Sequence, residues 1–258
     1  MGRLRIATND FGPFLDRREA GRLLSWECGH MRRVGALVLC PPGGGIIVAQ
    51  QLASSLEAEL DFVLSKKMRA PGRPEIPFGA ISETGNVVLD ETMVDELDVP
   101  RAYIAAERDL QERELRSQAQ AIRPTCHRVP VEGRTVILVD DGIETGGTLQ
   151  AALWAVSMEH PKTLIVGIPV GPEDGIARLA DDADLTVCLK VPPVLTSVRD
   201  FYMRDGWVGE KEALAILQEW QSGHISACGM PNPAPSSVPR AARPERAARR
   251  APCGALSG

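Results

Sequence analysis

Short, continuous apolar runs alternate with longer stretches of helical periodicity along most of the chain. Runs of about five apolar residues without polar alternation are typical of strands that are buried on both faces of a parallel sheet. In the stretches between them, apolar residues recur every three or four positions, which indicates helices with one buried face. The pattern predicts strands at residues 36–40, 60–64, 135–139, 163–169 and 185–189, and helices at 46–56, from 149 onward and at 173–180.

Strands and helices in this order predict an α/β fold, with an open parallel twisted sheet flanked by helices. Between its two halves, residues 78–89 predict a hairpin with a turn at 84–86. A long polar helix is then predicted from about Pro100 to Ile122, with Asp98 as its candidate cap.

The last part of the chain has a different composition. Residues 221–258 contain six prolines and few large apolar side chains. Such a segment cannot bury enough surface to offset the entropy cost of ordering it. We therefore expect one folded domain at residues 1–220 and a Pro/Ala/Arg-rich disordered tail at residues 221–258.

The formal net charge of −5 is unevenly distributed along the chain. Residues 221–258 carry five arginines and one glutamate, a net charge of +4, which leaves −9 for residues 1–220. An acidic body argues against general nucleic-acid binding, which needs a basic surface. For the tail alone, an arginine-rich arm that contacts RNA or an acidic partner remains the alternative to a passive extension.

Cysteine spacing and hydropathy exclude other classes of protein. The six cysteines show neither C-x-x-C spacing nor a nearby histidine pair, so they indicate reduced thiols rather than a zinc site or a disulfide framework. No apolar run approaches the roughly 20 residues of a membrane span. We expect a cytoplasmic protein without membrane contact.

The stretch "VDDGIETGGT" at residues 139–148 carries the clearest chemistry. It joins a predicted strand to a predicted helix, and ligands of open parallel sheets bind beyond the carboxyl ends of the strands. The carboxylates of Asp140 and Asp141 can accept hydrogen bonds from the two hydroxyls of a vicinal diol. Backbone N–H groups of residues 145–148 can hold a phosphate at the start of the helix. A ligand with both groups is a ribose 5-phosphate, whereas the structural alternative is a pair of helix caps.

The longer run "VILVDDGIETGGT" resembles the phosphoribosyl pyrophosphate (PRPP) motif of type I phosphoribosyltransferases. The runs "DRREAGRLL", "PPGGG" and "KKMRAPGRPEIPFGAI", with the Phe201-Tyr202 region, resemble a bacterial branch of that family, so that the resemblance covers roughly residues 14–220. It implies the type I fold with a small hood region over the site, and a phosphoribosyltransferase domain at residues 1–220. The implied reaction moves ribose 5-phosphate from PRPP to a nitrogenous base or similar acceptor, with release of pyrophosphate.

The resemblance also implies a role for each matched position. Asp140 and Asp141 would hold the ribose hydroxyls, with Asp141 also counted as catalytic, and the glycine-rich loop at 41–45 would hold pyrophosphate. Mg²⁺ would bridge pyrophosphate oxygens and ribose hydroxyls, so that the two aspartates bind it indirectly, through hydroxyls or water. The implied PRPP-binding residues are Asp140, Asp141, Thr145, Gly146, Gly147, Thr148, Pro42, Gly43, Gly44 and Lys66.

Pro42 departs from the pattern of the branch, which usually has arginine at this position. The chain thereby lacks a charged, bidentate partner for phosphate. Two interpretations stay open. Because related enzymes often have a cis peptide here and proline lowers the cost of the cis form, Pro42 could preserve the shape of the loop. Alternatively, the loop has lost its function.

Three further sets of residues are candidates with structural alternatives. Glu144 could act as a general acid or base beside the acceptor, or be a solvated side chain. A mobile basic loop, too long for a simple turn, could contain Lys66, Lys67 and Arg69 and fold over pyrophosphate, with Lys67 as a catalytic residue. The structural alternative is that these residues end a solvated strand. Aromatic side chains could stack on a base or simply pack; they are Phe201, Tyr202 and Trp207.

Two functions therefore remain open from the sequence. One is a phosphoribosyltransferase, and the other is a non-catalytic regulator that binds PRPP or a nucleoside monophosphate. An intact ribose-phosphate loop fits both, and the missing arginine favours the second. The acidic body, which offers no groove for nucleic acid, favours the first, and the enzyme is the function that we expect. The partners expected are PRPP and a small-molecule acceptor that the sequence does not name, and a homodimer is possible because dimers are frequent in the family.

Overall fold

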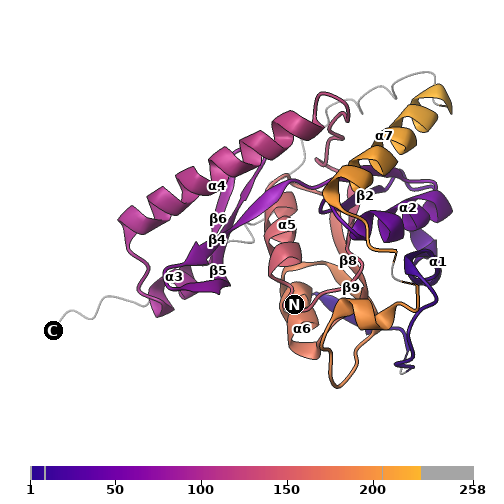
Figure 1. Ribbon diagram of the computed structural model, residues 1–258, viewed down its shortest axis with the longest axis horizontal. Coiled ribbons are helices and arrows are strands. Elements are labelled where there is room, and N and C mark those ends of the chain that lie inside the picture. The colour runs from indigo at the N-terminus through magenta and orange to yellow at the C-terminus, as the bar shows by residue number, and fades with distance from the viewer. Residues whose placement is uncertain (1, 9, 205, 228–258) are drawn as a thin grey trace.

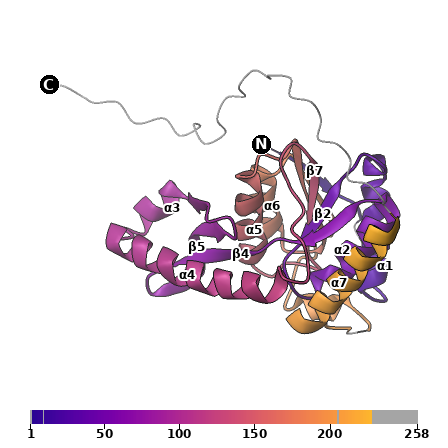
Figure 2. The ribbon, with the colours of Figure 1, turned by 90° about the horizontal axis from the view of Figure 1, so that it is seen from above.

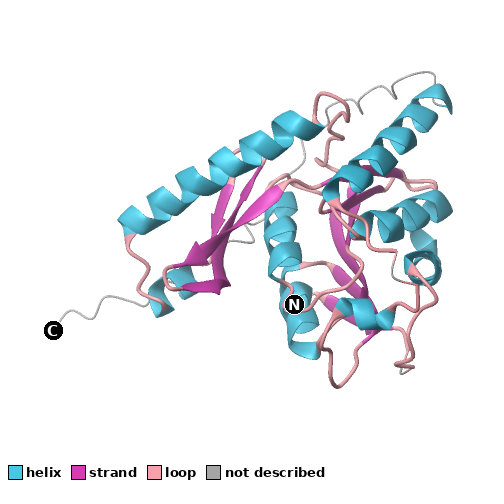
Figure 3. Cartoon of the chain, viewed as in Figure 1, coloured by secondary structure: helices cyan, strands magenta, loops and turns pink. Residues whose placement is uncertain are grey.

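The computed structural model describes residues 2–8, 10–204 and 206–227 (Figure 1). Its main sheet has six strands in the order β1-β9-β8-β7-β2-β3, and every neighbouring pair is parallel. The predicted open parallel sheet flanked by helices is therefore confirmed (Figure 3). Its strands are β1 (Arg3–Ile6), β2 (Leu37–Cys40), β3 (Glu59–Phe62), β7 (Thr135–Val139), β8 (Thr163–Val170) and β9 (Leu185–Lys190).

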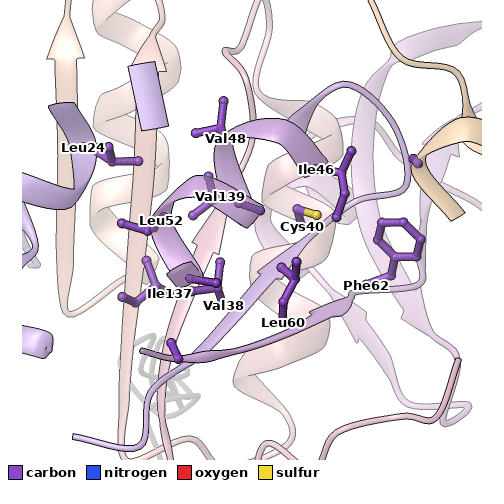
Figure 4. Packing of buried hydrophobic residues seen from close by; sticks show 14 of the residues in the cluster. Leu24, Val38, Cys40, Ile46, Val48, Leu52, Leu60, Phe62, Ile137 and Val139 are labelled. Carbon is purple, nitrogen blue, oxygen red and sulfur yellow. The ribbon is translucent and has the colours of Figure 1, made fainter. Parts of the chain in front are cut away.

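Helices cover both faces of this sheet, and the side chains of each strand alternate between two cores. On β7, Ile137 and Val139 belong to the first core, whereas Val136 and Leu138 belong to the second. Figure 4 shows the first core, in which Leu24 and Leu52 pack from helices against these strands. The first face is covered by α1 (Arg17–Glu27), α2 (Gly45–Leu56) and α7 (Glu210–Ala227), and the second by α5 (Gly147–Ser157) and α6 (Glu173–Asp182).

A second, smaller unit projects from the main body (Figures 1 and 2). It is an antiparallel sheet in the order β4-β5-β6, with its own small core around Met68 and Phe78. The hairpin predicted within residues 78–89 is confirmed. The elements of this unit are β4 (Ser65–Ala70), β5 (Arg73–Ser82), β6 (Val87–Leu89), α3 (Glu91–Glu96) and α4 (Arg101–Ile122).

The prediction of a basic loop at Lys66, Lys67 and Arg69 is wrong. These residues lie on β4 and pair with β5. Ala70 pairs with Arg73, so that only Pro71 and Gly72 form the connecting turn, and Gly72 has a φ of +70°. A proline followed by a residue with positive φ suits a tight two-residue turn, which the sequence interpretation mistook for a long irregular segment.

Two boundary predictions need correction. Helix α4 begins at Arg101 as expected, but Pro100 precedes it without a side-chain cap, so Asp98 does not cap it. The tail was predicted from residue 221, whereas α7 continues to Ala227. Gln221 is 6% exposed and its amide donates to the carbonyl of His127 at 3.1 Å, because this part of the helix still packs against the body. Residues 228–258 of the predicted tail lie outside the described residues.

A charged cluster fixes the small unit to the main body. Arg123, directly after α4, donates to the carboxylate of Asp61 on β3 at 2.8 Å and to both carboxylate oxygens of Glu83. Asp61 is 1% exposed, and burial raises the pKa of this carboxyl group above its ordinary value. The small unit also contacts the main body through β4 and β5, which lie beside α5.

Two expectations on composition can be compared with the described residues. Within them, no helix combines the length and the apolar character needed to cross a bilayer. The four cysteines that the structure describes, at positions 28, 40, 126 and 188, are buried free thiols.

Candidate functional site

The loops that follow β2 and β7 meet at the carboxyl edge of the sheet, because these two strands are neighbours. A Cβ atom added to Gly44 would lie 2.6 Å from Asp141 Oδ2, and one added to Gly45 would lie 2.5 Å from Asp140 Oδ1. Side chains at these two positions would therefore overlap the carboxylates. The glycines of the first loop allow it to lie directly against the acidic pair.

Gly45→Ala is expected to lower the free energy of unfolding by about 1–3 kcal/mol, because the new methyl group overpacks against Asp140. Urea unfolding measures this change. Gly223→Ala in α7 is the control, since a Cβ there meets nothing within 4 Å and alanine stabilises a helix relative to glycine. Equal stability changes in the two variants would contradict the close contact.

Arg17, on α1, forms an ion pair with Asp141 of the acidic pair. Its Nε lies 2.6 Å from Asp141 Oδ2, and the arginine is only 3% exposed. Its guanidinium lies 4.5 Å from the centre of the Tyr202 ring, and the Tyr202 hydroxyl donates to the carbonyl oxygen of Asp141. The backbone and the side chain of Asp141 are thus both fixed by residues far away in sequence.

Asp140 lies in a different electrostatic environment from Asp141. Its Oδ1 accepts from the N–H of Asp141 at 2.9 Å. Burial is the main cause that raises the pKa of Asp140 well above its ordinary value, and the neighbouring charge of Asp141 adds to it. Two adjacent carboxyl groups in one site disfavour double ionisation, so this arrangement is suited to a ligand that brings hydrogen-bond donors or a cation.

The loop at residues 145–148 leads into α5. Gly146 has a φ of +78° and precedes the helix without a side-chain cap, a backbone conformation that favours glycine. The N–H of Gly147 lies 3.5 Å from Thr145 Oγ1, while the N–H groups of Gly146 and Thr148 have no acceptor in the described part of the chain. Helix starts with free donors bind anions.

The loop at residues 41–45 presents a similar set of donors. The N–H groups of Gly43, Gly44 and Gly45 have no acceptor among the residues that the structure describes. Gly43 has a φ of +151°. The described residues contain no cis peptide bond, so the idea that Pro42 maintains a cis form is wrong. The loop offers backbone donors, but Pro42 brings neither a charge nor an N–H.

The structure separates the two lysines of β4. Lys66 Nζ lies 3.5 Å from Glu114 Oε2 on α4, away from the loops. Lys67 extends from the opposite face of the strand, and a Cβ added to Gly147 would lie 3.7 Å from its Nζ. Lys67 is thereby next to the loop at 145–148, and Lys66 is not.

Glu144 lies in the loop between the acidic pair and α5, where it is exposed. Its carboxylate accepts from the N–H of Val198 at 3.3 Å, at the start of the 3-10 helix η2 (Val198–Phe201).

The aromatic candidates differ in exposure. Tyr202 is 5% exposed and its ring packs against Phe14, so the ring offers no free face for stacking on a base. Trp207 is 57% exposed, with the Arg199 guanidinium 5.3 Å from its ring centre.

Sequence reasoning missed Arg17 and Arg178 as parts of the site. Arg178 on α6 donates to the carbonyl of Thr145 at 2.9 Å, and Arg17 pairs with Asp141. A signal for Arg17 was present, since its run "DRREAGRLL" places an arginine on the helix face that also buries Ala20 and Leu24. Arg178 gives no such signal, because an arginine on an exposed helix face is common.

Comparison with known proteins identifies the family of the chain. Residues 83–203 match the family model described as "Phosphoribosyl transferase domain". A crystal structure of TT1426 from Thermus thermophilus superimposes with a TM-score of 0.75 at 36% identity, over 81% of this chain and 99% of the other. The chain belongs to the phosphoribosyl transferase family. Its main sheet and flanking helices form the type I phosphoribosyltransferase fold.

Two curated relatives of this family member come from strains of Mycobacterium tuberculosis. They are named "Putative phosphoribosyl transferase MT0597" and "Putative phosphoribosyl transferase Rv0571c". Each is 35% identical over 204 residues, which is 79% of this chain and 46% of the relative. The aligned part thus spans about half the length of the curated relatives.

Proposed function

We propose that this phosphoribosyl transferase family member transfers ribose 5-phosphate from PRPP to a nitrogenous base or similar small acceptor, and releases pyrophosphate. The observation that carries the proposal is that the acidic pair lies against one donor-rich loop and leads into a second. Asp140 and Asp141 lie against Gly45 and Gly44, and the same strand end continues into the loop at 145–148. The two aspartates would bind the diol, the loop at 145–148 would bind the 5-phosphate, and the loop at 41–45 would bind the pyrophosphate.

The acidic pair and the residues around it would favour the transfer by stabilising charge and by fixing the position of the reacting groups. The two carboxylates would accept the ribose hydroxyls and lie near the carbon that gains positive charge as its bond to pyrophosphate breaks. Free N–H groups at residues 43–45 would donate hydrogen bonds to the leaving pyrophosphate and stabilise the negative charge that develops on it. Arg17 would keep Asp141 oriented, since a 2.6 Å contact with a buried guanidinium fixes the carboxylate.

The donor set fits Mg²⁺ only together with the ligand. No group of three or more His, Cys, Asp or Glu side chains that could hold a metal occurs within the described residues. Mg²⁺ is commonly bound by one or two carboxylates, water and substrate phosphates, and Asp140 and Asp141 would hold it in this way. When bound, it neutralises charge on pyrophosphate.

A second candidate is favoured by Pro42. A non-catalytic regulator that binds PRPP or a nucleoside monophosphate needs the loops at 140–141 and 145–148, but not a charged pyrophosphate loop. Glu144 bears on the same choice. As a general base it would have to release the N–H of Val198 to meet the acceptor, whereas in a regulator its hydrogen bond would only hold η2.

Calorimetric titration with Mg²⁺ and PRPP, and separately with nucleoside monophosphates, tests the proposal on the parent chain and Pro42→Arg. We expect PRPP to bind the parent. Pro42→Arg should bind it about tenfold more tightly, because a charge-assisted hydrogen bond contributes about 1.5–3 kcal/mol. Turnover with a panel of bases then identifies the acceptor.

The other outcomes are distinct. Binding of monophosphates with little affinity for PRPP, rescued by Pro42→Arg, supports the regulator or a disabled enzyme. Binding of PRPP without turnover for any base also favours the regulator. If neither PRPP nor any monophosphate binds, both candidates are wrong.

A further inference from the structure

Strand β4 presents its two neighbouring lysines to different parts of the molecule. Side chains alternate along a strand, and here Lys66 meets Glu114 on α4, while Lys67 extends toward the start of α5. The contact of β4 and β5 with α5 keeps this arrangement in place. One lysine thus has a carboxylate partner within the small unit, and the other reaches the edge of the main sheet.

Lys67 lies in a neighbourhood without a balancing negative charge. Its side chain forms no ion pair or hydrogen bond with any residue that the structure describes, although it is half-buried. Burial, followed by the positive charge of Arg69, lowers the pKa of Lys67. An anion from outside the chain would offset this desolvation, because an opposite charge nearby favours the charged form of a lysine.

Other donors point to the same place. A Cβ on Gly147 would lie 3.7 Å from Lys67 Nζ and 3.8 Å from Thr145 Oγ1, so the ammonium and the threonine hydroxyl flank the first residue of α5. The first turn of α5 contains no acidic residue. Around this residue, the ammonium, the threonine hydroxyl and the N–H groups of Gly146 and Thr148 donate to no acceptor among the described residues.

We propose that Lys67 binds the 5-phosphate of the ligand, as a cation that the small antiparallel sheet contributes to the loop at 145–148. This inference rests on the proposed function and differs from the expectation that Lys67 acts on pyrophosphate. A phosphate monoester with two negative charges has several oxygens, and the ammonium would neutralise one side of it while the N–H groups bind the other. The small unit thereby becomes part of the binding site.

The test measures binding of two separate halves of the donor by calorimetry: ribose 5-phosphate, and inorganic pyrophosphate with Mg²⁺. The variants are Lys67→Ala, Lys67→Arg, and Lys66→Ala as the matched control on the same strand. Lys67→Ala is expected to weaken ribose 5-phosphate at least about tenfold and to change pyrophosphate less than about twofold. Lys66→Ala should change neither, and Lys67→Arg should restore most of the affinity.

Thermal melting separates a lost contact from a lost fold. Because the ammonium group of Lys67 has no partner among the described residues, the Tm of Lys67→Ala without ligand should match the parent. Equal affinity of Lys67→Ala and parent for ribose 5-phosphate, or a loss confined to pyrophosphate, would overturn the inference while the proposed function stands. If the parent binds neither ribose 5-phosphate nor PRPP, the proposed function fails and the inference fails with it.

Discussion

Replacing Asp140 and Asp141 together with asparagine is expected to weaken Mg²⁺-dependent PRPP binding by more than about 100-fold. Each hydrogen bond to an ionised group contributes about 1.5–3 kcal/mol, and the loss of two such acceptors multiplies their effects on the dissociation constant. Asparagine keeps the size of the side chain but presents an amide donor where the ribose hydroxyl needs an acceptor. Calorimetric titration of PRPP into parent and variant measures the change.

The control for this variant is Asp109→Asn on α4, whose carboxylate pairs with Arg108 on an exposed helix face. It removes a charge of the same kind from the same acidic body and should leave PRPP affinity within about twofold. The double variant is also expected to be less stable, because replacing Asp141 leaves the buried guanidinium of Arg17 without its carboxylate partner. Thermal melting of the double variant therefore sets a titration temperature at which it is folded. If the double variant binds PRPP as well as the parent, the assignment of the ribose site is wrong.

The second large effect is expected from Arg17→Ala, which should lower the free energy of unfolding by about 3–5 kcal/mol. Removing one partner of a buried ion pair leaves the other without compensation, and here Asp141 would remain beside Asp140 with no cation. The stacking of the guanidinium on Tyr202 is lost as well. Urea unfolding gives the stability, and PRPP titration should show weaker binding because Asp141 loses its fixed orientation.

The neighbouring Arg18 provides a matched control on the same helix. It is exposed, so Arg18→Ala removes the same charge without a buried partner and should change stability by no more than about 0.5 kcal/mol. Arg17→Lys should recover part of the lost stability, since an ammonium restores the charge but not the planar geometry. Similar effects of Arg17→Ala and Arg18→Ala would show that the pair with Asp141 contributes little.

Sequence patterns predicted the strands around the site well because these strands are buried on both faces. The run at 135–139 is apolar at every position except Thr135, and the helix after it follows a glycine-rich turn, so strand, loop and helix each had a local signal. Strand β1 was not predicted. Its four residues, with two arginines, are exposed at the edge of the sheet, and an exposed edge strand gives no continuous apolar run.

The loop prediction for Lys66, Lys67 and Arg69 failed for a related reason. Successive charged residues and two prolines look irregular, whereas β4 is held by pairing with β5 and by the small core under Met68. Pairing with a partner strand is a non-local property, and it makes residues 65–70 a strand. In any strand, neighbouring side chains such as those of Lys66 and Lys67 extend to opposite faces. Their separate environments follow from that alternation.

The sequence by itself determined five of the six strands of the main sheet and the family, and identified the acidic pair with its glycine-rich loops, because each depends on residues that are close together in the chain. Tertiary structure decided what these loops contact. Arg17 meets Asp141 across 124 positions, Gly44 and Gly45 lie against the two carboxylates, and Lys67 reaches the start of α5. Such contacts arise when the carboxyl ends of parallel strands are brought to one edge, and no local pattern records them.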